Sequence, residues 1–148
     1  MESLTEFSNT NRDRINYILL DIPVIDNQHS VFFETFDKLL LLNQKEDNEE
    51  EREAKILSEL NGLERYTVYH FNTEEELMHE ANWEYIEQHI EQHNVFKNKC
   101  KEFQIAYNYK NKVLLEQMVL FLRRWFIMHI SEVDAAYAES IKIFLSKK

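Results

Sequence analysis

Five of the six histidines in this sequence, together with two carboxylates, are spaced so that they could hold metal ions inside a helical protein. His70 and Glu74 are four residues apart, and so are His89 and His93, which places each pair on one face of a helix. Neutral imidazoles and carboxylates suit iron, zinc, copper or nickel. A single histidine on an apolar helix face is usually a hydrogen-bonded core residue. Five such histidines, spread over four helices, favour a metal centre. The complete set is His29, His70, Glu74, His89, His93, His129 and Asp134.

The size of this set favours two metal ions over one. Five imidazoles are too many for a single tetrahedral zinc, whereas two metals bridged by carboxylates fit the count. Glu74 is one bridge candidate, and Asp134 is the other. Asp134 follows His129 by five residues, a step that turns about 140° around a regular α-helix. The helix must therefore loosen or end there, or Asp134 must reach the site obliquely.

The sixth histidine, His79, is expected to be a surface residue near a helix end. It forms a single Glu-x-x-His with Glu76. Ferritin-like di-iron sites use this motif twice, with two further glutamates. No second copy is present in the sequence, so a ferritin-like oxidase is disfavoured.

The composition predicts that long helices position these residues. The 148-residue chain suits one domain, is 44% hydrophobic, and contains only one glycine and one proline. So few turn residues disfavour a sheet with many hairpins. We predict an all-α domain over residues 1–148, with an irregular N-terminal arm over about 1–21, a bundle over about 22–134 and a short tail helix over about 135–148.

Apolar residues at alternating three- and four-residue steps define four bundle helices. Pro23 suits the first turn of the first helix, and the acidic run Glu49 to Glu51 suits the start of the second. The expected ranges are 22–42, 49–80, 83–107 and 112–133, with the tail helix over 135–145. Short connections predict an antiparallel up-down-up-down bundle. In that topology the five histidines fall at one end of the bundle, near the connection between the second and third helices.

The charge and the single cysteine limit the partners and the compartment. A net charge of −10 disfavours binding to nucleic acid or to an anionic membrane. Apolar runs such as residues 39–42 are far shorter than the roughly 20 residues of a membrane span. The sequence shows no secretory signal at its N-terminus, and the lone Cys100 excludes an internal disulfide. We expect a cytoplasmic protein, and the charged helix exteriors favour a monomer.

With these features on one chain, the sequence resembles the hemerythrin family, specifically its single-domain bacterial members. The similarity runs in the family order from about residue 23 to 134, and the ordered set of motifs is highly specific although each one alone is weak. The motifs are Ile25-Asp26-Asn27-Gln28-His29, His70-Phe71-Asn72-Thr73-Glu74-Glu75, His89-x-x-x-His93 and Trp125-x-x-x-His129-Ile130-x-x-x-Asp134.

The resemblance implies two non-haem iron ions with a bridging oxo or hydroxo group. By match, one iron is held by His89, His93 and His129. The other, which keeps an open position for O₂, is held by His29 and His70, and Glu74 and Asp134 bridge the two. The family binds O₂ reversibly, so the implied function is storage, delivery or scavenging of O₂ by a protein that is not an enzyme. The dry pocket that this requires is expected to contain Trp125, Phe126, Ile130 and Phe32, although Phe32 could equally be ordinary core.

Two alternatives use the same site. A di-iron peroxidase or nitric oxide reductase needs protons at the metals, and His79 and Tyr17 are the only loose candidates for a relay. An O₂-sensing module would have to act through a partner chain, with the tail helix as a possible docking surface.

The sequence also departs from the family at Asp21, where a glycine is common, and at Trp83-Glu84, where a Tyr-Pro pair is usual. Neither departure touches a proposed ligand.

Overall fold

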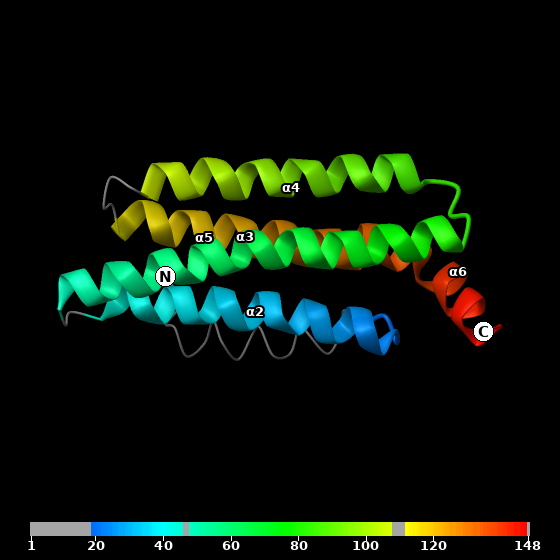
Figure 1. Ribbon diagram of the computed structural model, residues 1–148, viewed down its shortest axis with the longest axis horizontal. Coiled ribbons are helices and arrows are strands. Elements are labelled where there is room, and N and C mark those ends of the chain that lie inside the picture. Colours follow the sequence, from blue (N-terminus) through cyan, green and yellow to red (C-terminus); the bar gives the residue numbers. More distant parts are fainter. Residues whose placement is uncertain (1–18, 46–47, 108–111, 148) are drawn as a thin grey trace.

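The computed structural model describes residues 19–45, 48–107 and 112–147, and every regular element within them is helical. Four long helices form the body of the molecule (Figure 1), and a π-helix and a shorter α-helix follow without a break. In chain order they are α2 (Pro23–Gln44), α3 (Glu49–Glu80), α4 (Ile86–Tyr107), α5 (Lys112–Met128), the π-helix η1 (His129–Asp134) and α6 (Ala135–Ser146).

The four long helices form an antiparallel up-down-up-down bundle, as predicted. Helix α2 packs against α3 and α5, and α4 packs against the same two helices. The colour gradient in Figure 1 shows successive helices running in opposite directions, with α6 leaving the bundle at an angle beyond the end of α5. The predicted short tail helix is therefore present. Most of the predicted N-terminal arm, and the turn expected at residues 108–111, lie outside the described residues.

Local capping explains where the first two helices begin. Pro23 occupies the first turn of α2, where its missing N–H is not needed. The Asp26 carboxylate accepts hydrogen bonds from the backbone N–H groups of Leu20 (2.9 Å) and Ile22 (3.2 Å), which anchors the preceding chain. The side chain of Asn48 caps α3 by accepting from Glu50 N (3.0 Å). The predicted start of the second helix at residue 49 is confirmed.

The third helix begins later than predicted, at Ile86 and not at Trp83. Helix α3 ends in a Schellman motif, because Asn82 adopts a left-handed conformation (φ 55°) and Trp83 N donates to Met78 O (2.9 Å). Trp83 therefore belongs to the connection. The fourth helix also differs, because its α-helical geometry ends at Met128.

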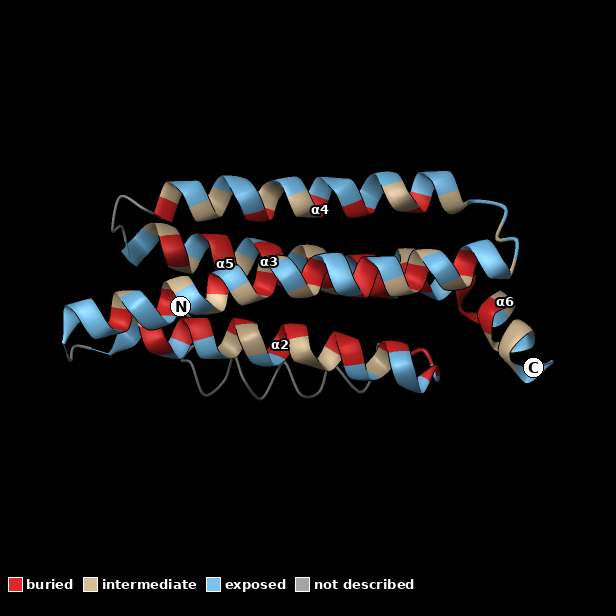
Figure 2. Cartoon of the chain, in the orientation of Figure 1, coloured by how far each residue is buried: buried red, intermediate tan, exposed pale blue. Residues whose placement is uncertain are grey.

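The buried faces of the four long helices meet along the bundle axis, as the red segments of Figure 2 show. The core of the bundle is rich in phenylalanine, and Cys100 is buried, as expected of a core residue. The fully or almost fully buried phenylalanines are Phe32, Phe33, Phe36, Phe71, Phe96 and Phe126. None of the described helices is both long enough and apolar enough to cross a membrane.

Candidate metal centre

All seven predicted ligands lie at the end of the bundle where α3 connects to α4, and all are buried. His70, Glu74, His93 and Asp134 are 0% exposed, and the other three histidines are at most 4% exposed. Because the helices alternate in direction, residues early in α2 and α4 meet residues late in α3 and α5. The structure therefore brings the predicted set together at one level of the core.

The π-helix η1 solves the geometric problem posed by the five-residue step from His129 to Asp134. Its backbone makes i→i+5 hydrogen bonds, including Ala135 N to Ile130 O. Such a wide turn places residues five apart above one another. The Nε2 atom of His129 and the Oδ1 atom of Asp134 are consequently 3.0 Å apart. Of the three alternatives that the sequence left open, the structure shows the first, in which the helix loosens.

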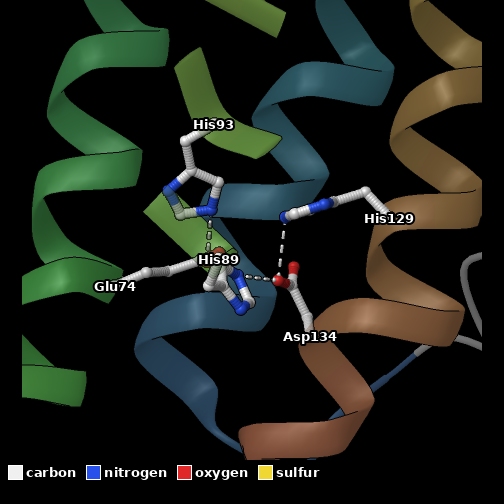
Figure 3. Close-up of side chains that lie close together, drawn as sticks. All are labelled: Glu74, His89, His93, His129 and Asp134. Atoms are coloured by element: carbon white, nitrogen blue, oxygen red, sulfur yellow. Dashed lines mark ion pairs between the residues drawn. The ribbon is translucent and has the colours of Figure 1, made fainter. Parts of the chain in front are cut away.

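Three histidines and both carboxylates form the larger group of candidate donors (Figure 3). One donor atom from each residue lies within 4.8 Å of the others. His89 Nε2 is 2.8 Å from Asp134 Oδ1, and His93 Nε2 is 3.3 Å from Glu74 Oε2. This three-histidine group consists of Glu74, His89, His93, His129 and Asp134.

The remaining two histidines form a second group that shares Glu74. The donor atoms of His29, His70 and Glu74 also lie within 4.8 Å of one another. Glu74 Oε1 is 2.6 Å from His70 Nε2 and 3.2 Å from His29 Nε2. Asp134 Oδ2 faces the same group, 3.4 Å from His29 Nε2. Each carboxylate thus presents one oxygen to the three-histidine group and the other to the two-histidine group, which is the arrangement that bridging ligands require.

Side chains around the two groups orient three of the rings. The Nδ1 atom of His70 lies 2.8 Å from Gln28 Oε1, and that of His129 lies 3.2 Å from Gln92 Oε1. An amide oxygen only accepts, so in both histidines Nδ1–H is the donor and the Nε2 lone pair points into the site. His93 Nδ1 is 2.9 Å from Glu75 Oε2.

The charges in the metal-free site shift the histidine pKa values in both directions. Burial lowers the pKa of His29, but hydrogen bonds to Asp134 and Glu74 outweigh it and raise that pKa to about 9. The pKa of His89 is raised to about 9 by the same balance. Burial dominates for His70 and lowers its pKa. The neighbouring histidines hold the pKa values of Glu74 and Asp134 below their usual range despite burial.

Several donor atoms of the site lie at ion-pair distance from one another but make no hydrogen bond of acceptable geometry with the described residues. These buried atoms are His70 Nε2, His89 Nε2, His93 Nε2, His129 Nε2, Glu74 Oε2 and both carboxylate oxygens of Asp134. Buried polar atoms in folded proteins almost always have partners. Inward-facing imidazole nitrogens and carboxylate oxygens are the ligands that transition metals take, so these residues fit a pair of metal ions.

Apolar side chains cover the two-histidine group. Phe126 lies edge-on to His29, with ring centroids 5.5 Å apart, and Phe32 lies edge-on to His70 at 5.2 Å. The two phenylalanines stack at 4.2 Å, and Ile130 is also fully buried. The fourth predicted pocket residue lies elsewhere, because Trp125 stacks on His129 of the three-histidine group at 4.6 Å.

Several residues near the site escaped the sequence reasoning. Gln28 and Glu75 directly adjoin predicted ligands, but adjacency alone does not show that a side chain turns inward. Tyr137 is 0% exposed, and its ring lies 5.2 Å from that of His89. Its position three residues after Asp134 was the available signal. By contrast, His79 is exposed in the last turn of α3, as expected, and Tyr17 lies outside the described residues.

Comparison with known proteins relates most of this chain to one family. The family model described as the hemerythrin HHE cation binding domain matches residues 20–140. A bacteriohemerythrin of Pseudomonas paraeruginosa is 29% identical over 126 residues, covering 85% of this chain and 78% of the relative.

Other bacteria contain similar proteins. A bacteriohemerythrin of Stenotrophomonas maltophilia is 28% identical, covering 86% of this chain and 80% of the relative. A bacteriohemerythrin of Clostridium acetobutylicum is also 28% identical, covering 81% of this chain and 93% of the relative. No solved structure gave a significant match. Because the family model spans most of the chain and includes all seven clustered residues, this chain belongs to the hemerythrin family.

Proposed function

We propose that this protein binds O₂ reversibly at a non-haem di-iron centre, for storage, delivery or scavenging. The observation that supports this most directly is the unequal division of donors. Three histidines lie on one side of the two carboxylates and only two on the other. His89, His93 and His129 would hold one iron, and His29 and His70 the other, so the second iron has fewer protein ligands and can accept O₂.

When bound, the iron pair, with an oxo or hydroxo bridge, supplies the electrons that O₂ withdraws on binding and returns on release. The protein's own contribution is to hold the donors and to keep water away. Gln28 fixes the ring of His70 through its Nδ1–H. Phe32 and Phe126 occupy the space beside His29 and His70, where water or a stray proton donor would promote irreversible oxidation.

The test is to load the metal-free protein with Fe²⁺ under argon, admit O₂ and record the visible spectrum. We expect a charge-transfer band that appears with O₂ and disappears when O₂ is removed. Metal analysis should give two irons per chain. A protein that loads two irons but shows no such band, or shows one that never reverses, is not a reversible O₂ carrier.

A second candidate function, a di-iron peroxidase or nitric oxide reductase, is favoured by Tyr137. Its hydroxyl is buried and makes no hydrogen bond within the described residues. Burial and the charges of Glu74 and Asp134 raise its pKa well above the usual value, so the hydroxyl remains protonated. A phenol that stays protonated beside His89 is a proton source of the kind that peroxidase or reductase chemistry needs. Steady turnover of peroxide or nitric oxide with a reductant, and no stable oxygenated form, would support this function over O₂ storage.

A further inference from the structure

Two histidines of the three-histidine group differ in the side chain that contacts Nδ1, the ring nitrogen facing away from the site. His93 Nδ1 is paired with a carboxylate, Glu75 Oε2, at 2.9 Å. His129 Nδ1 is paired with a neutral amide, Gln92 Oε1, at 3.2 Å. The two-histidine group has only an amide, Gln28 on His70, while His29 Nδ1 is buried and has no hydrogen-bond partner among the described residues. Of the three side chains that hydrogen-bond to the outer nitrogen of a ligand ring among the described residues, Glu75 is the one with a carboxylate.

We propose that Glu75 is a positioning residue that selectively strengthens metal binding at the three-histidine position, acting through His93. This inference rests on the proposed di-iron site, but it concerns the relative affinity of the two positions and not the binding of O₂.

The geometry around His93 suits this role. Phe71 stacks on the ring at 3.8 Å with an interplanar angle of 7°, which limits its rotation. Glu75 then fixes which nitrogen faces inward, leaving His93 Nε2 3.3 Å from Glu74 Oε2. The side chain of Glu75 is 18% exposed, so its carboxylate keeps contact with solvent and need not be fully desolvated.

The charge of Glu75 adds to this orientation. A carboxylate that accepts from the outer N–H of a ligating imidazole makes the ring a stronger electron donor to the metal. An amide oxygen orients a ring equally well but lacks the full negative charge. The three-histidine position should therefore bind metal more tightly than it would if His93, like His129, had an amide partner. The two-histidine position gains nothing from Glu75.

The experiment titrates the metal-free full-length protein with Co²⁺, followed by calorimetry and visible absorption. E75Q keeps the size of the side chain and an acceptor oxygen while removing the charge. E76Q is the matched control, because Glu76 is on the same helical turn but exposed. H70Q, which removes a nitrogen from the two-histidine position, assigns the two binding steps.

We expect E75Q to weaken the step assigned to the three-histidine position by about 10- to 100-fold, with the other step unchanged. E76Q should leave both steps as in the wild type. The proposal is overturned if E75Q binds Co²⁺ as E76Q does, or if both steps weaken equally.

A second variant keeps the proposal testable if E75Q does not fold. Q92E offers His129 the carboxylate partner that His93 already has, and it should tighten the same step. Absence of tightening in Q92E would then overturn the proposal. Since Co²⁺ binding needs neither iron nor O₂, failure of the proposed O₂ function would leave this result standing, and the reverse also holds.

Discussion

His129 and Asp134 are five residues apart in the chain, yet their Nε2 and Oδ1 atoms are 3.0 Å apart because one π-helical turn separates them. A π-turn inside an α-helix is unfavourable in general and often marks a functional site. Here it continues α5 and leads directly into α6. The backbone is therefore shaped to bring a carboxylate under a histidine that a regular helix would separate from it.

Moving the carboxylate by one residue tests this relationship. In V133D/D134V the acid follows His129 by four residues, the spacing that suits a regular α-helix but not η1. We expect at least tenfold weaker metal binding than wild type, measured as metal retained after dialysis against a graded chelator. Wild-type retention by the double variant would show that the π-helix does not align the site.

The stability of the metal-free protein should fall as pH rises from about 6.5 to about 9. The pKa values of His29 and His89 are raised to about 9 in the folded protein, from 6.5 in a free histidine. Their protonated forms therefore stabilise the fold fully below pH 6.5, and this contribution is lost as pH rises through 9. His70, whose pKa is lowered in the folded protein, opposes this trend only near pH 6.5, where it is still partly protonated in the unfolded state. The two carboxylates remain ionised throughout.

Denaturant unfolding of metal-free protein at pH 6.5 and pH 9 measures this effect. H89Q is the control, and it should lose less stability over the same interval than the wild type. A free energy of unfolding that stays constant or increases with pH would contradict the assigned protonation of the two histidines.

Replacement of Phe126 should affect both the fold and the proposed O₂ chemistry. F126A removes a fully buried ring and should destabilise the fold by about 3–5 kcal/mol. It also opens the space beside His29, so we expect the oxygenated iron protein to decay to the oxidised form at least severalfold faster.

F36A is the matched control for F126A. Phe36 is equally buried, and its ring contacts within the described residues are with other phenylalanines. It should cost similar stability in thermal unfolding but leave the decay rate, followed by visible absorption, near that of wild type. Equal decay rates in the two variants would show that Phe126 does not protect the oxygenated centre.

Removal of the Tyr137 hydroxyl should stabilise the metal-free protein slightly. A buried hydroxyl without a partner costs about 1–3 kcal/mol, so Y137F should unfold at a higher denaturant concentration. Y107F, a change at a buried tyrosine near the opposite end of the bundle, controls for the loss of a phenol in general. Lower stability in Y137F would show that its hydroxyl has a partner.

The sequence determined the helices and the set of residues that they bring together. Repeats of three and four residues, few turn residues and short connections specify an antiparallel bundle, because each helix must bury one apolar face. In that topology His29 and His70 have to meet His89 and His129 at one end. The start of α3 at Glu49 could also be predicted, because its acidic first turn is a local feature.

Tertiary structure alone decided how the donors are oriented. Packing around the turn decides whether residues 129–134 form an α-helix or a π-helix. A π-helix turns the side chain of Asp134 into the site, whereas an α-helix would turn it away. Packing also placed Trp125 on His129, and Phe32 and Phe126 beside the histidine pair. The partners Gln28, Glu75 and Gln92 are contacts between helices, and periodicity along a single helix carries no information about which side chain it meets on the next.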